Sequence, residues 1–148
     1  MPGEWQYSLV GVDAVDPAVL RAASAITIAV IDTGADVTAP DLAAKTPLTW
    51  NQRTGSSDVR DTIGHGTFVA ALAAGSVTNG EGIAGFGGDA QLLVIKAGSG
   101  DGSFTDLDEA SAIVYAVDHG ARIINLSLGG PSTTSTERNA IDYAVAHG

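Results

Sequence analysis

Short apolar runs alternate along this chain with segments of helical periodicity. Two runs are nearly continuous and rich in β-branched residues, at 26–31 (Ile-Thr-Ile-Ala-Val-Ile) and at 91–96 (Gln-Leu-Leu-Val-Ile-Lys), and a third covers 122–128. Runs of this kind are typical of strands that are buried on both faces, as in a parallel sheet. The pattern therefore predicts three buried strands.

Helical patterns precede and follow these runs. Asp16 is predicted as an N-cap with Pro17 in the first position, and Gly75 and Gly120 are predicted to end later helices. The predicted helices cover 16–23, 66–74, 105–119 and 137–147, and 34–64 is predicted as a loop with short elements. The side chains expected to pack inward are Trp5, Tyr7, Leu9 and Val10 in the N-terminal arm, and Ala110, Ile113, Val114, Val117, Ile141, Ala144 and Val145 in the last two helices.

The order strand, helix, strand, helix, strand, helix predicts an α/β fold, a three-layer parallel sheet with helices on both faces. An N-terminal arm (1–24) precedes the α/β core (25–148). Because a parallel sheet would continue with another strand after the last helix, we expect this fold to be incomplete, the N-terminal part of one domain.

The chain is acidic and contains no cysteine, with 17 acidic and 7 basic residues and a net charge of -10. Repulsion from phosphate predicts that nucleic acid and anionic membranes are not partners, although an acidic surface also simply favours solubility. The lack of cysteine excludes disulfides and thiolate metal sites. No apolar run is long enough to span a membrane, and the first five residues lack the pattern of a signal peptide.

Two residues are candidates for catalysis. Asp32 directly follows a buried run, where a carboxylate must be paired or must cap its own turn. His65 lies between two glycines at the start of a helix, which fits a surface turn or an exposed general base. Together they favour catalysis, because a histidine base needs a carboxylate that fixes its tautomer and stabilises its charged form.

Asp32-Thr33-Gly34 also occurs in aspartic peptidases, and residues 30–36 resemble the retroviral form. In that alternative two chains would each supply one carboxylate in an all-β homodimer. The alternation of strands and helices argues against it, and so does the unexplained motif around His65.

Four segments, in order, resemble the subtilisin-like serine peptidases, most closely the thermitase and bacterial subtilisin branch. They are 28–34 with Pro40-Asp41-Leu42 beyond, 64–70 (Gly-His-Gly-Thr-Phe-Val-Ala), 82–85 (Gly-Ile-Ala-Gly) and 123–130 (Ile-Ile-Asn-Leu-Ser-Leu-Gly-Gly). The chain departs from the family at Phe68 and Ala39, where the family has histidines.

The resemblance implies a serine endopeptidase in which Asp32 orients His65, and His65 takes a proton from a serine hydroxyl. It implies that an extended polypeptide pairs with the backbone of Ser127, Leu128 and Gly129 on one edge and of Gly100 to Gly102 on the other. Phe104, Leu107 and Leu128 match positions of an outer apolar pocket, although ordinary core packing explains them equally well.

The family's nucleophile motif, Gly-Thr-Ser-x-Ala, does not occur in these 148 residues. We therefore expect the chain alone to be inactive, and a non-catalytic peptide-binding paralogue or fragment stays an alternative. An exposed sheet edge would further predict that the chain pairs with a missing C-terminal half or with itself. Secretion to the extracellular space is implied by the resemblance alone.

No cofactor is required for this chemistry, but the resemblance implies structural calcium. The matching oxygens belong to the carboxylate of Asp41, the side chain of Asn79 and the carbonyls of Glu81 and Ile83. An ordinary Asn-Gly turn at Asn79 is the alternative.

Overall fold

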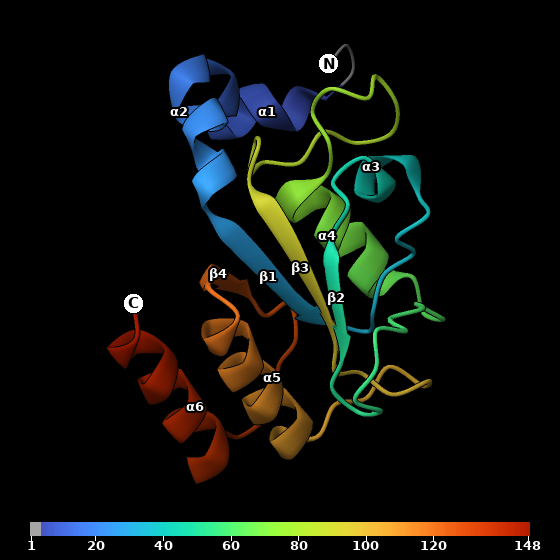
Figure 1. Ribbon diagram of the computed structural model, residues 1–148, viewed down its shortest axis with the longest axis vertical. Helices are drawn as coiled ribbons and strands as arrows, with labels where there is room; N and C mark the ends of the chain where they lie inside the picture. The colour runs from blue at the N-terminus through green and yellow to red at the C-terminus, as the bar shows by residue number, and fades with distance from the viewer. Residues whose placement is uncertain (1–3) are drawn as a thin grey trace.

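The computed structural model describes residues 4–148. Residues 1–3, which begin the predicted N-terminal arm and the segment that lacks a signal-peptide pattern, lie outside the described residues. Within this range a parallel sheet of four strands has the order β2-β3-β1-β4 (Figure 1). The strands are β1 (Thr27–Asp32), β2 (Leu48–Asn51), β3 (Gln91–Lys96) and β4 (Ala121–Asn125). The three predicted strands are confirmed in place, and β2 is an additional one.

Two strands differ from the prediction. The segment Leu48–Asn51 lies within the predicted loop, because only four residues of it pair with β3 and no alternating apolar pattern marks it. Strand β4 ends at Asn125, which pairs with Val30, rather than at residue 128. Residues 126–128 leave the sheet, so their backbone N–H and C=O groups are not used in pairing with β1.

Side chains from alternate positions of the sheet form two separate cores. Ile28, Val30, Leu92 and Val94 pack with helix α4 (His65–Ala74) on one face. Ala29, Ile31, Leu93 and Ile95 pack with helix α5 (Asp106–Asp118) on the other, and α6 (Ser135–Ala146) lies against α5 (Figure 1). This confirms the α/β fold with helices on both faces of a parallel sheet.

The N-terminal arm is helical and mostly solvent-exposed. It contains α1 (Trp5–Val10), the 3-10 helix η1 (Val12–Ala14), α2 (Pro17–Ala22) and η2 (Ala23–Ala25). Asp16 caps α2 as predicted, since its side chain accepts a hydrogen bond from the Ala18 amide at 2.7 Å. The expected packing of Trp5, Leu9 and Val10 is wrong, because all three are exposed.

The inward positions of the last helices are also partly wrong. Ala140 is the buried residue of α6, whereas Ile141 and Val145 are exposed. The reason is that α6 packs mainly against α5. A neighbouring helix covers a narrower stripe of the α6 surface than a sheet would. In α5 the buried residues are Ala110, Ala112, Ile113 and Ala116, while Val114 and Val117 lie at the margin. A short helix, α3 (Pro40–Ala43), packs beside α4, and none of the described helices is both long and apolar enough to cross a membrane.

Candidate active site

Asp32 is the last residue of β1 and is almost fully buried, with 1% of its side chain exposed. Its Oδ1 accepts a hydrogen bond from the Thr33 amide at 2.7 Å. Its Oδ2 is buried and accepts no hydrogen bond from any residue of the 4–148 range. A buried carboxylate is costly unless it is paired, so Asp32 depends strongly on the few groups that face it.

His65 supplies the main partner of this carboxylate. It is the first residue of α4, and its Nδ1 lies 2.8 Å from Asp32 Oδ1. Because an ionised carboxylate can only accept, Nδ1 carries the proton and the opposite ring nitrogen, Nε2, is left as the basic atom. The ring is 48% exposed, so Nε2 is available to a reacting group.

Glycine allows the chain to bring these two residues together. Gly64 precedes His65 with a φ of 92°, a left-handed conformation that other residues rarely adopt. Gly34 follows the acid, and a Cβ there would lie 2.2 Å from the carbonyl oxygen of Val59. The glycines of the two motifs are therefore required by backbone geometry.

One residue of this site, Asp61, was not predicted from the sequence. Its carboxylate accepts a hydrogen bond from the hydroxyl of Thr33 at 3.0 Å and another from the Thr67 hydroxyl at 2.7 Å. Burial opposes the charged form, but the hydrogen bonds from Thr67, Gly64 and Ile63 outweigh it and hold the pKa of Asp61 at about 2. The sequence did offer one signal for Asp61: an acidic residue four positions before His65, the candidate base, with which helix α4 begins.

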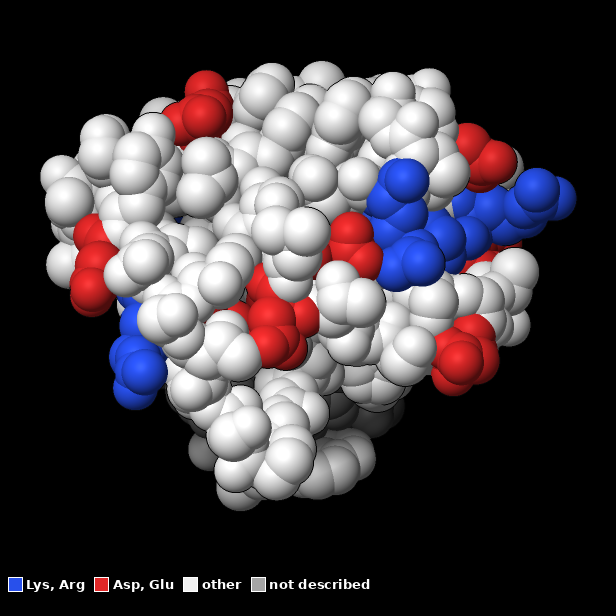
Figure 2. Space-filling model, turned by 90° about the horizontal axis from the view of Figure 1, so that it is seen from below, with Lys and Arg blue, Asp and Glu red and all other residues white. Residues whose placement is uncertain are grey.

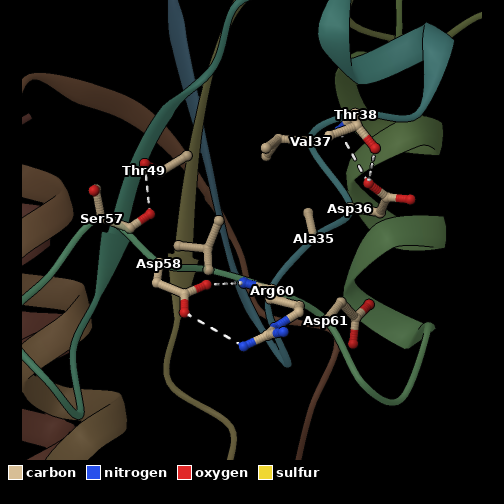
Figure 3. A pocket seen from close by; sticks show the side chains of 10 residues that line it. Ala35, Asp36, Val37, Thr38, Thr49, Ser57, Asp58, Arg60 and Asp61 are labelled. Atoms are coloured by element: carbon tan, nitrogen blue, oxygen red, sulfur yellow. Dashed lines mark hydrogen bonds and ion pairs between the residues drawn. The ribbon is translucent and has the colours of Figure 1, made fainter.

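Asp61 also lines a shallow groove beside β2, with a volume of about 490 Å³ (Figure 3). The groove lies between residues 35–38 and 57–61, and Arg60 and Asp58 stand at its edge. Neither Asp32 nor His65 lines it. The groove is therefore adjacent to the candidate pair and is not itself the reaction site.

The predicted substrate segments lie on either side of Asp32. Gly100 and Gly102 follow β3, and Ser127, Leu128 and Gly129 follow β4; these two strands flank β1 in the sheet. Carboxyl ends of parallel strands meet at one edge of a sheet, so both segments emerge near the end of β1. Seen from this end, acidic side chains lie in the middle of the surface and at its edges, and basic side chains lie on opposite sides of it (Figure 2).

The three residues assigned to an outer pocket differ in exposure. Phe104 packs against the core on the α5 side, Leu128 is half-buried, and Leu107 is exposed in a groove between α5 and α6. Packing accounts for Phe104, whereas Leu107 is open to solvent and stays a candidate for contact with a ligand.

The predicted calcium ligands come together only in part, and their present arrangement does not fit a cation. Asn79 donates its side-chain N–H to Asp41 Oδ1, and the Ile83 amide donates to Asp41 Oδ2, each at 2.9 Å. Both carboxylate oxygens thus face N–H groups, where calcium needs oxygen ligands. Among residues 4–148 no group of three or more His, Cys, Asp or Glu side chains is placed to hold a metal ion.

Comparison with known proteins agrees with this geometry. Residues 23–148 match the Subtilase family. The chain is 44% identical over 126 residues to "Thermophilic serine proteinase" of Bacillus sp. (strain AK1), covering 85% of this chain and 31% of that protein. It is 39% identical over 121 residues to "Thermitase" of Thermoactinomyces vulgaris, covering 82% of this chain and 43% of that protein.

A solved structure gives the same result. The crystal structure of fervidolysin from Fervidobacterium pennivorans, described as a keratinolytic enzyme related to subtilisin, superposes with a TM-score of 0.78 at 31% identity. The match covers 93% of this chain and 22% of that one. The chain belongs to the subtilase family. It spans less than half the length of these relatives, and its family and α/β fold overturn the alternative of an all-β aspartic peptidase dimer.

Proposed function

We propose that Asp32 and His65 are two members of the Asp-His-Ser triad of a serine endopeptidase. The observation that carries this proposal is the 2.8 Å contact between His65 Nδ1 and the buried carboxylate of Asp32, in a chain that belongs to the subtilase family. The arrangement fixes the ring tautomer and leaves Nε2 exposed and basic. A general base needs both properties.

The chemistry follows from this placement. Nε2 of His65 takes the proton of a serine hydroxyl as that oxygen attacks the peptide carbonyl, and then gives the proton to the leaving amine. Asp32 stabilises the imidazolium that forms between these steps, and it does so strongly because water is excluded from its side. Asp32 itself stays ionised throughout.

Substrate is proposed to bind as an extended strand between the segments that follow β3 and β4. Gly100, Gly102 and Gly129 would leave the backbone accessible, and Ser127 and Leu128 would pair with the peptide along the other edge. Main-chain pairing of this kind gives affinity with little dependence on side chains. We expect a broad specificity, with Leu107 contributing an apolar preference.

These 148 residues lack the Gly-Thr-Ser motif, and we propose that on their own they do not turn over peptides. Loss of a triad serine lowers the rate about a millionfold, so two triad members cannot compensate for the third. The chain would still bind extended peptides, which distinguishes an incomplete enzyme from a misfolded one.

Hydrolysis of a fluorogenic casein substrate tests the proposal. The chain is compared with a chimera in which the residues that follow the matched region in thermitase are joined to Gly148. We expect no turnover by the chain alone. The chimera should hydrolyse casein, and His65→Ala or a serine-directed phosphonate should abolish this activity, while the matched control His147→Ala should retain it.

Two outcomes would contradict the proposal. A folded chimera with equal activity in the wild-type and His65→Ala forms would remove His65 from the mechanism. Activity of the 148-residue chain that is lost in His65→Ala would show that another nucleophile acts here.

Binding of casein peptides by the chain without cleavage favours an incomplete enzyme or a peptide-binding paralogue.

We also propose that the apolar surface near β4 is covered by further polypeptide, either a C-terminal half or a second copy of this chain. Ile123 and Val145 are exposed, and β4 pairs only with β1 among the described residues. If a second copy covers it, size-exclusion chromatography should detect dimers or larger species of the isolated chain, and a sharp monomeric peak would contradict that occupant. Secretion stays a prediction.

A further inference from the structure

Five hydrogen bonds converge on the carboxylate of Asp61. Oδ2 accepts from the amide and the hydroxyl of Thr67, at 2.9 and 2.7 Å. Oδ1 accepts from the amides of Ile63 and Gly64, at 3.0 and 2.9 Å, and from the hydroxyl of Thr33 at 3.0 Å. Only a carboxylate can accept on both atoms at once, because an amide would present N–H groups on one side.

These bonds connect the two segments of the candidate site, the end of β1 and the start of α4. Thr33 directly follows Asp32, and its amide donates to Asp32 Oδ1. The Thr33 hydroxyl, which donates to Asp61, also accepts from the amide of Gly66, the residue after His65. Asp61 therefore holds the backbone on both sides of His65 and, through Thr33, the backbone beside Asp32.

We propose that Asp61 is a positioning residue that keeps His65 Nδ1 against Asp32. The proposal rests on the proposed function only in giving this contact a catalytic purpose. Asp61 contacts neither member of the pair directly. It acts by tying the residues just before α4 to the residue after β1, and this holds the His65 ring in one orientation.

The charge state of Asp61 is suited to this task. Its low pKa keeps the carboxylate ionised, and able to accept all five bonds, through the neutral and mildly acidic range. The three backbone amides among the donors would otherwise stay without partners at the start of α4, so a purely local capping role is the competing explanation. The two explanations differ in what happens to the histidine ring.

The tautomer of His65 separates them, because only a ring held against Asp32 keeps its proton on Nδ1. Side-chain ¹⁵N shifts of the 148-residue chain, recorded above neutral pH, report this tautomer without any hydrolysis. We expect wild-type His65 as the Nδ1–H form. The Nδ1 atoms of His119 and His147 contact carbonyl oxygens of their own helices, so they serve as internal references.

Two matched pairs of variants test the proposal. Asp61→Asn should shift His65 towards the Nε2–H form, whereas Asp58→Asn, an exposed acid of the same loop, should not. Thr33→Val removes the hydroxyl between Asp61 and Gly66 and should cause the same shift, while Thr33→Ser should keep the wild-type tautomer. Circular dichroism confirms that each variant is folded.

The outcomes are decisive. A folded Asp61→Asn variant with unchanged His65 tautomer overturns the proposal, and if that variant does not fold, an unchanged tautomer in Thr33→Val does so. A shift in Thr33→Val but not in Thr33→Ser supports it. A wild-type His65 in the Nε2–H form would instead refute the contact with Asp32, and with it the proposed function.

Discussion

Gly66 lies directly against Gly34: a Cβ on Gly66 would come within 2.1 Å of the Gly34 carbonyl oxygen and 3.0 Å of Asp32 Cβ. The two glycines belong to different motifs, one after β1 and one in the first turn of α4. Their close approach sets the distance at which His65 reaches Asp32. It also explains why a helix rich in small residues, with Ala70, Ala71 and Ala74 buried, packs so near the sheet.

Gly66→Ala should therefore destabilise the chain strongly. Overpacking at a site where both neighbours are backbone or buried atoms costs about 3 kcal/mol, because neither can move freely. A Cβ on Gly130 would meet only the Ser132 carbonyl oxygen, at an ordinary contact distance of 3.9 Å, and Gly130 has no left-handed φ, so Gly130→Ala should change the free energy of unfolding by less than about 1 kcal/mol. Urea denaturation measures both, and equal midpoints would contradict the close approach.

The N-terminal arm is joined to the core through Tyr7. Its hydroxyl lies within hydrogen-bond distance of the carbonyl oxygens of Ala84 and Gly85, which share its single proton, and its ring stacks on Phe86 with centroids 4.9 Å apart. Burial, and then the charge of Glu4, raise the pKa of Tyr7 to about 12. Tyr7→Phe should lower the free energy of unfolding by about 1 kcal/mol through the lost hydrogen bonds.

This residue also predicts a dependence on alkaline pH. The raised pKa means that the folded state holds the Tyr7 proton more tightly than the unfolded state does. Its contribution is complete below pH 10 and is lost as the pH rises towards 12. Thermal denaturation across this range should show a decline that is smaller in Tyr7→Phe. An equal decline in Tyr7→Phe and wild type would contradict the assignment.

Much of the fold could be predicted from the sequence, because buried parallel strands leave a strong local signal. β3 has the predicted bounds, and β1 is shifted by a single residue. Strand β2 was missed since four residues at a sheet edge carry almost no periodic pattern. The exposure of Trp5 and Val145 was missed because apolar composition alone does not say whether anything covers a side chain.

The candidate site, too, was predicted only in part from the sequence. Asp32 and His65 were found because their motifs are specific, and the structure brings them together. Asp61 was missed because its role depends on three backbone amides, before and within the first turn of α4, and on two hydroxyls that come together only on folding. The ligands around Asp41 were proposed from resemblance, and which atoms face the carboxylate could be learned only from side-chain orientation.

Helix α6 depends on a capping box at its start. The Thr134 hydroxyl accepts from the Glu137 amide, and the Glu137 side chain accepts from the Thr134 amide at 2.7 Å. Thr134→Ala should cost about 1 kcal/mol, whereas Thr133→Ala, one residue outside the cap, should be nearly neutral. Chemical denaturation followed by circular dichroism compares them, and equal stability of the two variants would mean that α6 does not rely on this cap.

Asp41 offers a test of metal dependence. Its carboxylate is buried, accepts from Asn79 and the Ile83 amide, and lies so close to Gly82 that a Cβ there would come within 2.1 Å of Oδ2. Asp41→Ala leaves both donors without a partner, so we expect a loss of about 3 kcal/mol. The exposed Asp142→Ala should be nearly neutral.

Because these hydrogen bonds already satisfy the carboxylate, the loss in Asp41→Ala should be the same in millimolar calcium and in EDTA. Wild-type Tm should also be unchanged by calcium, since a ligand raises Tm only when it binds the folded state. A rise in wild-type Tm with calcium that is absent in Asp41→Ala would contradict this prediction. It would mean that Asn79 and the 81–83 loop turn their oxygens towards a bound ion, as the family resemblance implied.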